Sequence, residues 1–178
     1  MRYADSPSAH DEVLIDAAPS EVWKLVTDIG LPARLSPELQ RTEWLDGATG
    51  PAVGATFAGY NRHPAVGEWR TVSRIDELVP ERLFEWVVID PESRFGPFDP
   101  AKPLAAWRFE LEPADGGTLL RHSGRMGPGR SGVSAYIDRA PEREEEVIEM
   151  RLGEIRTGIR ATLDGIKSLA EEGPGQPG

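Results

Sequence analysis

Between residues 40 and 126 the hydrophobic positions of the chain alternate with polar ones, as they do in half-buried β-strands. In residues 104–113, for example, Trp107, Phe109 and Leu111 share one face, and charged residues occupy the other. A shorter segment of the same kind lies near the N-terminus. The pattern predicts strands at residues 10–17, 40–47, 54–63, 66–80, 82–90, 104–113 and 118–126. Strands with one apolar face each predict an antiparallel sheet that is covered on one side only.

Other segments have a helical period. Pro19 or Ser20 is predicted to begin a helix that ends at Gly30, and Pro32 to begin a second, short one. Pro141 and the acidic residues after it favour the start of a third helix. That helix would be roughly 30 residues and about 45 Å long. Its apolar positions recur every three or four residues: Ile148, Leu152, Ile155, Ile159, Leu163 and Ile166.

A helix of this length needs a long apolar surface, and the inner face of the sheet is the only candidate. We therefore predict an α+β fold in which a curved antiparallel sheet wraps around the C-terminal helix. Because a strongly bent sheet rarely closes around one helix without a gap, we expect an apolar cavity between them. Residues 10–172 are predicted as a single ligand-binding domain, with residues 1–9 and 173–178 as flexible ends.

Composition narrows the possible functions. The chain has 178 residues, of which 39% are hydrophobic and 28% charged, as in globular proteins. Its net charge of −10 and the lack of any long basic run argue against binding to nucleic acid or to an anionic membrane surface. No apolar stretch is long enough for a membrane span, and the N-terminal residues have no apolar core of a secretory signal. Cysteine is absent, so a cytoplasmic location is expected.

Metal and cofactor sites are not expected. The histidines, His10, His63 and His122, lie far apart in the sequence, and no HExxH motif is present. The sequence also lacks the elbow motif that would support a nucleophilic serine. Any chemistry would therefore have to use side chains of the sheet and helix alone.

Several segments together resemble the Bet v 1-like/START-related (SRPBCC) superfamily, in particular its bacterial polyketide cyclase/dehydrase and lipid-transport branch. The segments are IDAAPSEVWKLVTDI (15–29), SPELQRTEWLDG (36–47), FAGYN (57–61), EWRTVSRIDELVPERLFEW (68–86), WRFELEPADGGTLL (107–120) and RLGEIRTGIRATLDGIKSLAE (151–171). The resemblance covers residues 10–172 and implies the helix-grip fold, with element order β-α-α-β6-α. It implies a ligand cavity but no particular reaction, because the family contains both carriers and cyclising or dehydrating enzymes.

Strand alternation predicts which residues line the cavity. His122 lies among apolar neighbours and is the candidate general acid or base; alternatively it is a hydrogen-bonded residue at the cavity rim. Asn61 is the second catalytic candidate, as a donor to a ligand carbonyl, or else it satisfies backbone groups beside Gly59. The tryptophans could stack on a planar ligand or belong to the core. The predicted lining is Phe57, Asn61, Trp69, Thr71, Trp86, Trp107, His122, Ile155 and Ile159.

Three functions remain open at this level. The first is binding of a small hydrophobic or aromatic molecule without a cofactor. The second is catalysis, as a polyketide cyclase, aromatase or dehydratase that uses His122. The third is an accessory role through contact with a partner protein. The irregular segment 90–103, with Phe95 and Phe98, is either a lid or a simple connection, and the oligomeric state is not predicted.

Overall fold

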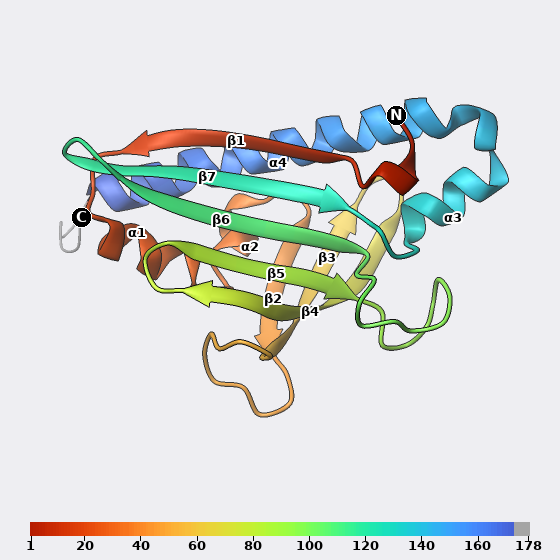
Figure 1. The fold of residues 1–178 in the computed structure, drawn as a ribbon, viewed down its shortest axis with the longest axis horizontal. Coiled ribbons are helices and arrows are strands. Elements are labelled where there is room, and N and C mark those ends of the chain that lie inside the picture. Colours follow the sequence, from red (N-terminus) through yellow and green to blue (C-terminus); the bar gives the residue numbers. More distant parts are fainter. Residues whose placement is uncertain (173–178) are drawn as a thin grey trace.

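The computed structural model describes residues 1–172 and contains all the predicted strands. They pair antiparallel in one seven-stranded sheet with the order β1-β7-β6-β5-β4-β3-β2 (Figure 1). Consecutive strands from β2 to β7 are neighbours, and only β1 crosses over to pair with β7. The strands are β1 (Ser8–Ile15), β2 (Leu39–Trp44), β3 (Thr56–His63), β4 (Gly67–Val79), β5 (Leu83–Ile89), β6 (Ala105–Ala114) and β7 (Gly117–Met126).

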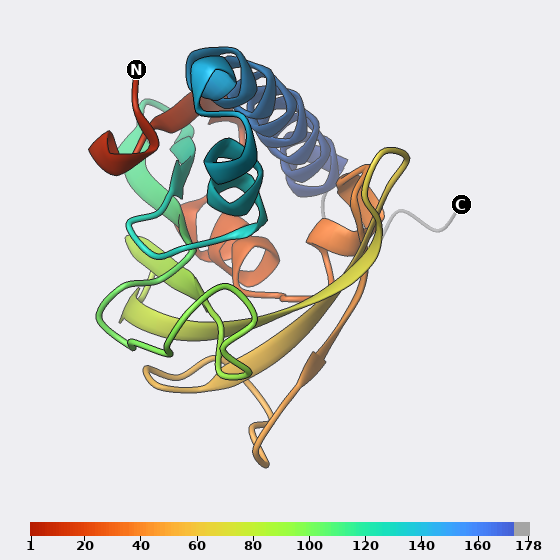
Figure 2. The same cartoon turned by 90° about the vertical axis from the view of Figure 1, so that its right-hand side faces the viewer.

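The long C-terminal helix is α4 (Glu144–Glu172), preceded by the 3₁₀ turn η2 (Pro141–Arg143). The sheet curves beneath α4, so the predicted α+β helix-grip fold is confirmed (Figure 2). Among the strands, α4 lies closest to β1 and β7. Two of its cations also reach β1: Arg160 Nη1 donates to Asp11 Oδ2 at 2.9 Å, and Lys167 Nζ donates to the Leu14 carbonyl at 2.8 Å. The second bond covers a carbonyl of an edge strand, where pairing groups are otherwise free.

The two helices between β1 and β2 are shorter than predicted. They are α1 (Pro19–Val26), which starts with proline at its first turn, and α2 (Pro32–Leu35). Ser36 has extended backbone angles, as expected for a residue that precedes a proline, and so α2 stops after one turn. Leu35 packs against Gly165 of α4, where a Cβ would come within 2.5 Å of the leucine side chain.

A further helix, α3 (Gly132–Arg139), is not predicted by the alternation analysis. Its N-cap is Ser131, whose side chain accepts a hydrogen bond from the Ser134 amide. Ile137 is its buried apolar residue. Eight residues give too few turns for a periodic signal, and the glycines just before the helix suggest a loop.

Tyr3 packs against the domain, within the segment 1–9 that the sequence analysis predicts as a flexible end. Tyr3 lies in the turn η1 (Tyr3–Asp5) and is only 9% exposed. Its hydroxyl donates to the Gly129 carbonyl at 2.8 Å, and its amide donates to Glu144 Oε1 at 2.8 Å. One buried aromatic residue is therefore enough to hold a segment that otherwise looks small and polar. The predicted flexible C-terminal end, residues 173–178, lies outside the described residues.

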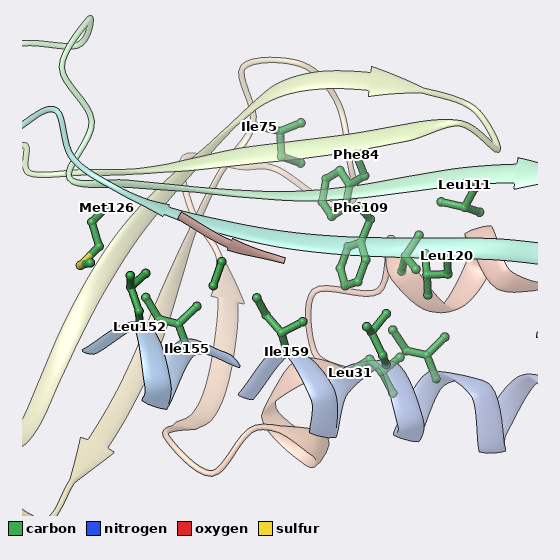
Figure 3. Close-up of a cluster of buried hydrophobic side chains, with 14 of the residues drawn as sticks. Leu31, Ile75, Phe84, Phe109, Leu111, Leu120, Met126, Leu152, Ile155 and Ile159 are labelled. Carbon is green, nitrogen blue, oxygen red and sulfur yellow. The ribbon is translucent and has the colours of Figure 1, made fainter. Parts of the chain in front are cut away.

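The core lies between the concave face of the sheet and α4. Figure 3 shows side chains of the sheet, among them Phe84, Phe109 and Leu120, pointing toward those of α4, among them Leu152 and Ile159. All of these side chains are almost fully buried. Among the described residues, no helix is both long and apolar enough to cross a membrane.

The packing of α4 predicts a sharp contrast between two leucines on the same helix. Leu163 is fully buried, so Leu163→Ala should leave a cavity and lower the free energy of unfolding by about 3 kcal/mol. Leu169 is 37% exposed, so Leu169→Ala should cost less than about 1 kcal/mol. Urea denaturation followed by circular dichroism measures both. Equal losses for the two variants would contradict this packing.

Candidate functional site

The strand register places the predicted lining residues on one face. Asn61 of β3 lies opposite Trp69 of β4, and Trp86 of β5 lies opposite Trp107 of β6. Residues opposite each other in an antiparallel pair point to the same side of the sheet. Phe57, on the same side as Asn61, belongs to the core cluster beneath α4. This side is therefore the concave one, in agreement with strand alternation.

Aromatic rings form a continuous row along this face. Phe57 contacts Trp44 at 5.8 Å and Trp86 at 6.5 Å between ring centroids. Trp86 in turn lies 5.8 Å from Phe109. Rings at such distances attract each other beyond the area they bury. The row therefore forms an aromatic floor across the middle of the sheet.

Trp107 lies over Gly124 of β7. A Cβ at Gly124 would come within 2.7 Å of the Trp107 ring. Glycine at this position is what allows the ring to approach the neighbouring strand so closely, because any other residue would displace it.

The predicted lining residues differ in how far α4 covers them. Phe57 of the sheet and Ile155 and Ile159 of α4 are buried in the core. His122 is buried as well, whereas Asn61, Trp69, Thr71, Trp86 and Trp107 keep intermediate exposure. Trp86 and Trp107 lie on central strands, whose edges are covered by neighbours, and so their exposed surface faces the concave side. We call these five residues the open concave face.

The sequence analysis expects a cavity between the sheet and α4, but the two hollows described here lie elsewhere. One hollow, of about 610 Å³, lies within the β2–β3 connection, Leu45–Thr56. Another, of about 230 Å³, lies where the β6–β7 turn meets β1 and the end of α4. Neither lies between the sheet and α4. The helices cover the sheet unevenly: α4 contacts β1 and β7, α1 contacts β6 and β7, and α2 contacts β2, so β3 to β5 are the strands least covered by helices.

His122 of β7 borders this surface and is nearly buried. Its Nδ1 lies 3.0 Å from the Arg108 carbonyl oxygen. A carbonyl oxygen only accepts, so Nδ1 carries the proton of the neutral ring. Burial lowers the pKa of His122 to about 4, and the hydrogen bond to Arg108 offsets this only in part. The imidazole is therefore neutral near pH 7.

Nε2, the other ring nitrogen of His122, has no hydrogen-bond partner among the described residues. Every fully buried side-chain nitrogen or oxygen of these residues does have a partner. Nε2 therefore retains a small accessible surface, although His122 as a whole is only 5% exposed. The rings of Phe109, Trp107 and Trp86 lie 4.0, 5.6 and 6.2 Å from the imidazole centroid. The result is one accessible, proton-free nitrogen among aromatic rings.

This state of His122 limits its chemistry. A side chain with a pKa of about 4 is a weak base near neutral pH, because general bases work best with a pKa close to the operating pH. Its Nε2 also has no proton to donate. The geometry suits hydrogen-bond acceptance better than proton transfer.

Asn61, the second catalytic candidate, points its amide at the backbone. Its Nδ2 lies 3.4 Å from the Gly59 carbonyl, and Thr71 Oγ1 lies at the same distance from that oxygen. Both bonds are long and therefore weak. This contact agrees with the alternative that Asn61 satisfies backbone groups beside Gly59, and it leaves the amide free to exchange that bond for one to a ligand.

A second polar group, which the sequence analysis missed, joins α4 to the β2 side of the sheet. Arg151 Nη1 donates to Glu38 Oε1 and to Glu154 Oε2, each at 2.7 Å. His63 Nε2 lies 3.0 Å from Glu154 Oε1. Burial opposes ionisation, but the hydrogen bonds from Arg151 and His63 outweigh it and lower the pKa of Glu154. Arg151 and Glu154 are three residues apart on α4, but Glu38 and His63 come from distant segments, so spacing alone could not reveal this ion-pair cluster.

The ion-pair cluster contains a possible metal-ligand set. Ligand atoms of Glu38, His63 and Glu154 lie within 4.8 Å of one another. However, Arg151 already binds both carboxylates. In addition, the Ala65 amide donates to His63 Nδ1 at 3.1 Å, so the proton of the neutral ring is on Nε2, the nitrogen that would have to coordinate. The arrangement favours ion pairing over metal binding.

The segment 90–103 is anchored at the sheet margin. Asp90 accepts a hydrogen bond from the Phe95 amide at 3.0 Å, and Arg130 Nε donates to the Phe95 carbonyl at 2.9 Å. The side chain of Phe98 is 44% exposed. Phe95 lies beside Gly132 of α3. Of the two aromatic residues proposed for a lid, Phe95 is partly buried and Phe98 is exposed.

The sequence matches one family model, described as polyketide cyclase/dehydrase and lipid transport, over residues 6–171. The chain belongs to this family. A search of curated proteins finds no match. The polyketide-cyclase-like protein Cgl2372 of Corynebacterium glutamicum, solved by NMR, is 31% identical, with 92% of this chain and 91% of that chain covered and a TM-score of 0.63.

Other similar structures share the fold at low identity. The Zhui aromatase/cyclase of Streptomyces sp. R1128 is 16% identical over 93% of this chain and 94% of that chain, with a TM-score of 0.65. The di-domain ARO/CYC BexL from the BE-7585A pathway is 18% identical over 98% of this chain and 52% of that chain, with a TM-score of 0.68. The allergen Ara h 8.0201 is 16% identical over 91% and 98%, with a TM-score of 0.55. The resemblance to the Bet v 1-like superfamily is thus confirmed for the fold.

The buried histidine predicts an acid-dependent loss of stability. His122 has a folded-state pKa of about 4, below the ordinary value of about 6.5 in the unfolded chain. As pH falls from 6.5 to 4, the unfolded state takes up a proton that the folded state does not, and the free energy of unfolding should fall by up to about 3 kcal/mol. His122→Phe should remove this part of the pH dependence in urea denaturation. A wild-type stability difference between pH 7 and pH 4 that survives unchanged in His122→Phe would contradict the assignment.

The ion-pair cluster predicts energetic coupling between Glu38 and Arg151. Both side chains are about one quarter exposed, and a double-mutant cycle of Glu38→Gln and Arg151→Met should give a coupling of about 1 kcal/mol. The exposed pair Arg143–Glu146 is the control, for which the same cycle should give no measurable coupling. Coupling that is no greater for Glu38–Arg151 than for the control pair would show that the cluster does not hold α4 to the sheet.

Proposed function

We propose that the protein binds a small hydrophobic or aromatic molecule on the open concave face, between the sheet and α4, without a cofactor. Membership of a family described by cyclase, dehydrase and lipid-transport activities supports a hydrophobic ligand. The observation that carries the proposal is the partial exposure of Trp86 and Trp107 in the middle of the concave face. Large rings that remain accessible at the centre of a sheet offer apolar area that a ligand can cover.

The energetic gain from such covering is substantial. Removing apolar surface from water contributes roughly 25 cal/mol per Å², and flat rings add stacking interactions with a planar ligand. The remaining polar groups nearby, Asn61, Thr71 and His122, are few. A mostly apolar surface with a small number of polar groups is the usual composition of a small-molecule site. In this proposal Phe57, Ile155 and Ile159 form its inner wall.

Catalysis as a cyclase, aromatase or dehydratase is the second candidate. It is favoured by the accessible Nε2 of His122 beside aromatic rings, where it could take a proton from an enolisable ligand. The low pKa of the same imidazole makes that step inefficient near neutral pH. Binding is therefore the better-supported function. An accessory role through a partner protein is the remaining alternative, and it requires no ligand.

Binding of a neutral environment-sensitive dye, N-phenyl-1-naphthylamine, tests the site. The wild-type protein should enhance and blue-shift the dye fluorescence in a saturable manner. Trp107→Arg replaces part of the aromatic floor with a charge, and dye affinity should fall by at least about tenfold, a change of about 1.4 kcal/mol. The control is Leu14→Arg, at a residue of β1 that is 62% exposed, which should leave dye affinity unchanged.

Further results distinguish ligand binding from the accessory role and from catalysis. Saturable dye binding that survives Trp107→Arg in a folded protein would place the site elsewhere, and no binding by the wild type would support the accessory role. Native mass spectrometry of protein purified from its own host should show a bound small molecule. Conversion of that molecule by the purified protein would favour the enzyme instead.

A further inference from the structure

We propose that the ligand is a neutral aromatic molecule that carries a hydroxyl group, and that His122 selects it by accepting a hydrogen bond from this hydroxyl at Nε2. The inference rests on the proposed binding function and names the chemistry that the site distinguishes. It distinguishes three kinds of ligand with the same aromatic body: a hydroxyl compound, its ether and its carboxylate.

The first argument is the fixed tautomer of His122. The Arg108 carbonyl, 3.0 Å from Nδ1, keeps the proton on that nitrogen. The ring cannot turn over without losing this bond. The imidazole also stacks on the ring of Phe109, which lies 4.0 Å away between centroids and within 11° of parallel. Nε2 is therefore a preorganised acceptor, and it has no proton with which to donate to an ether or a carbonyl.

The second argument is position. Trp86 and Trp107, the accessible rings of the aromatic floor, are inclined by only 27° and 30° to the imidazole. A planar ligand that lies against either ring is therefore brought alongside His122, and a substituent on its edge can reach Nε2. A hydroxyl that donates to Nε2 satisfies this acceptor, whereas an apolar group would cover Nε2 and leave it without a hydrogen bond.

The third argument is charge. His122 is surrounded by the rings of Phe109, Trp107 and Trp86, and its hydrogen bond among the described residues goes to the uncharged Arg108 carbonyl. Arg151 of α4 is held by Glu38 and Glu154. The whole chain carries a net charge of −10. A ligand carboxylate would thus lose hydration without gaining a partner, and its oxygens would meet the lone pair of Nε2.

Three matched probes test this inference at pH 7: 2-naphthol, 2-methoxynaphthalene and 2-naphthoate. The first can donate a hydrogen bond, the second keeps the oxygen but cannot donate, and the third is ionised. Their affinities are measured by displacement of N-phenyl-1-naphthylamine from the wild-type protein. We expect 2-naphthol to bind about tenfold more tightly than 2-methoxynaphthalene, and 2-naphthoate to bind most weakly.

Two further measurements link the preference to His122. In the wild-type protein, the ¹⁵N resonance of His122 Nε2 should shift with 2-naphthol and not with 2-methoxynaphthalene. In His122→Phe the ratio of the two affinities should fall to about one. His63→Gln is the matched control and should keep the wild-type ratio, because the Nε2 of His63 is already bonded to Glu154.

The outcomes separate this inference from the proposed function. Equal affinity for 2-naphthol and 2-methoxynaphthalene, together with normal dye binding, would overturn the hydroxyl preference and leave the binding function standing. Tightest binding of 2-naphthoate would reveal a cationic anchor and would also overturn it. Failure of the dye and of all three probes to bind would instead contradict the proposed function. If His122→Phe does not fold, the wild-type affinities and the ¹⁵N shift still decide.

Discussion

The position of α4 over one side of the sheet is the constraint on which the rest of the structure depends. Its apolar residues, among them Ile148 and Leu163, are fully buried, and the helix lies closest to β1 and β7. On the β2 side the helix is held by long charged side chains, led by Arg151 to Glu38. The helix is therefore tightly packed on the β1–β7 side and held by ion pairs on the β2 side, and the partly exposed Trp86 and Trp107 lie between these sides, on β5 and β6.

The fold could be predicted from the sequence because its signals are long and regular. Seven alternating segments and one long amphipathic segment are consistent with a single arrangement, and each of those elements is present. The misses are short features that depend on tertiary contacts. Tyr3 is held by a hydrogen bond to Gly129, more than a hundred residues away, and α3 has only two turns. No local pattern encodes such contacts.

The candidate site was only partly predictable, for a related reason. Alternation decides which face a residue occupies, and it placed Asn61, Trp86 and His122 together on the concave side. It does not decide how far a helix covers that face, nor which nitrogen of an imidazole carries the proton. Both depend on positions in three dimensions: the lean of α4, and the Arg108 carbonyl beside His122. The ion-pair cluster was missed because its members are brought together only by folding.

The pairing of β1 with β7 has a consequence for how the chain reaches its native state. Ser8 lies opposite Arg125 and Ile15 opposite Thr118. β1 therefore cannot pair until β7, more than a hundred residues later in the chain, has been synthesised. During synthesis on the ribosome, β2 to β6 can pair in chain order as they emerge. Their apolar face stays uncovered until the final helix is released, because α4 is the last described element. Nascent chains of this protein are therefore expected to need protection from aggregation until α4 has left the ribosome.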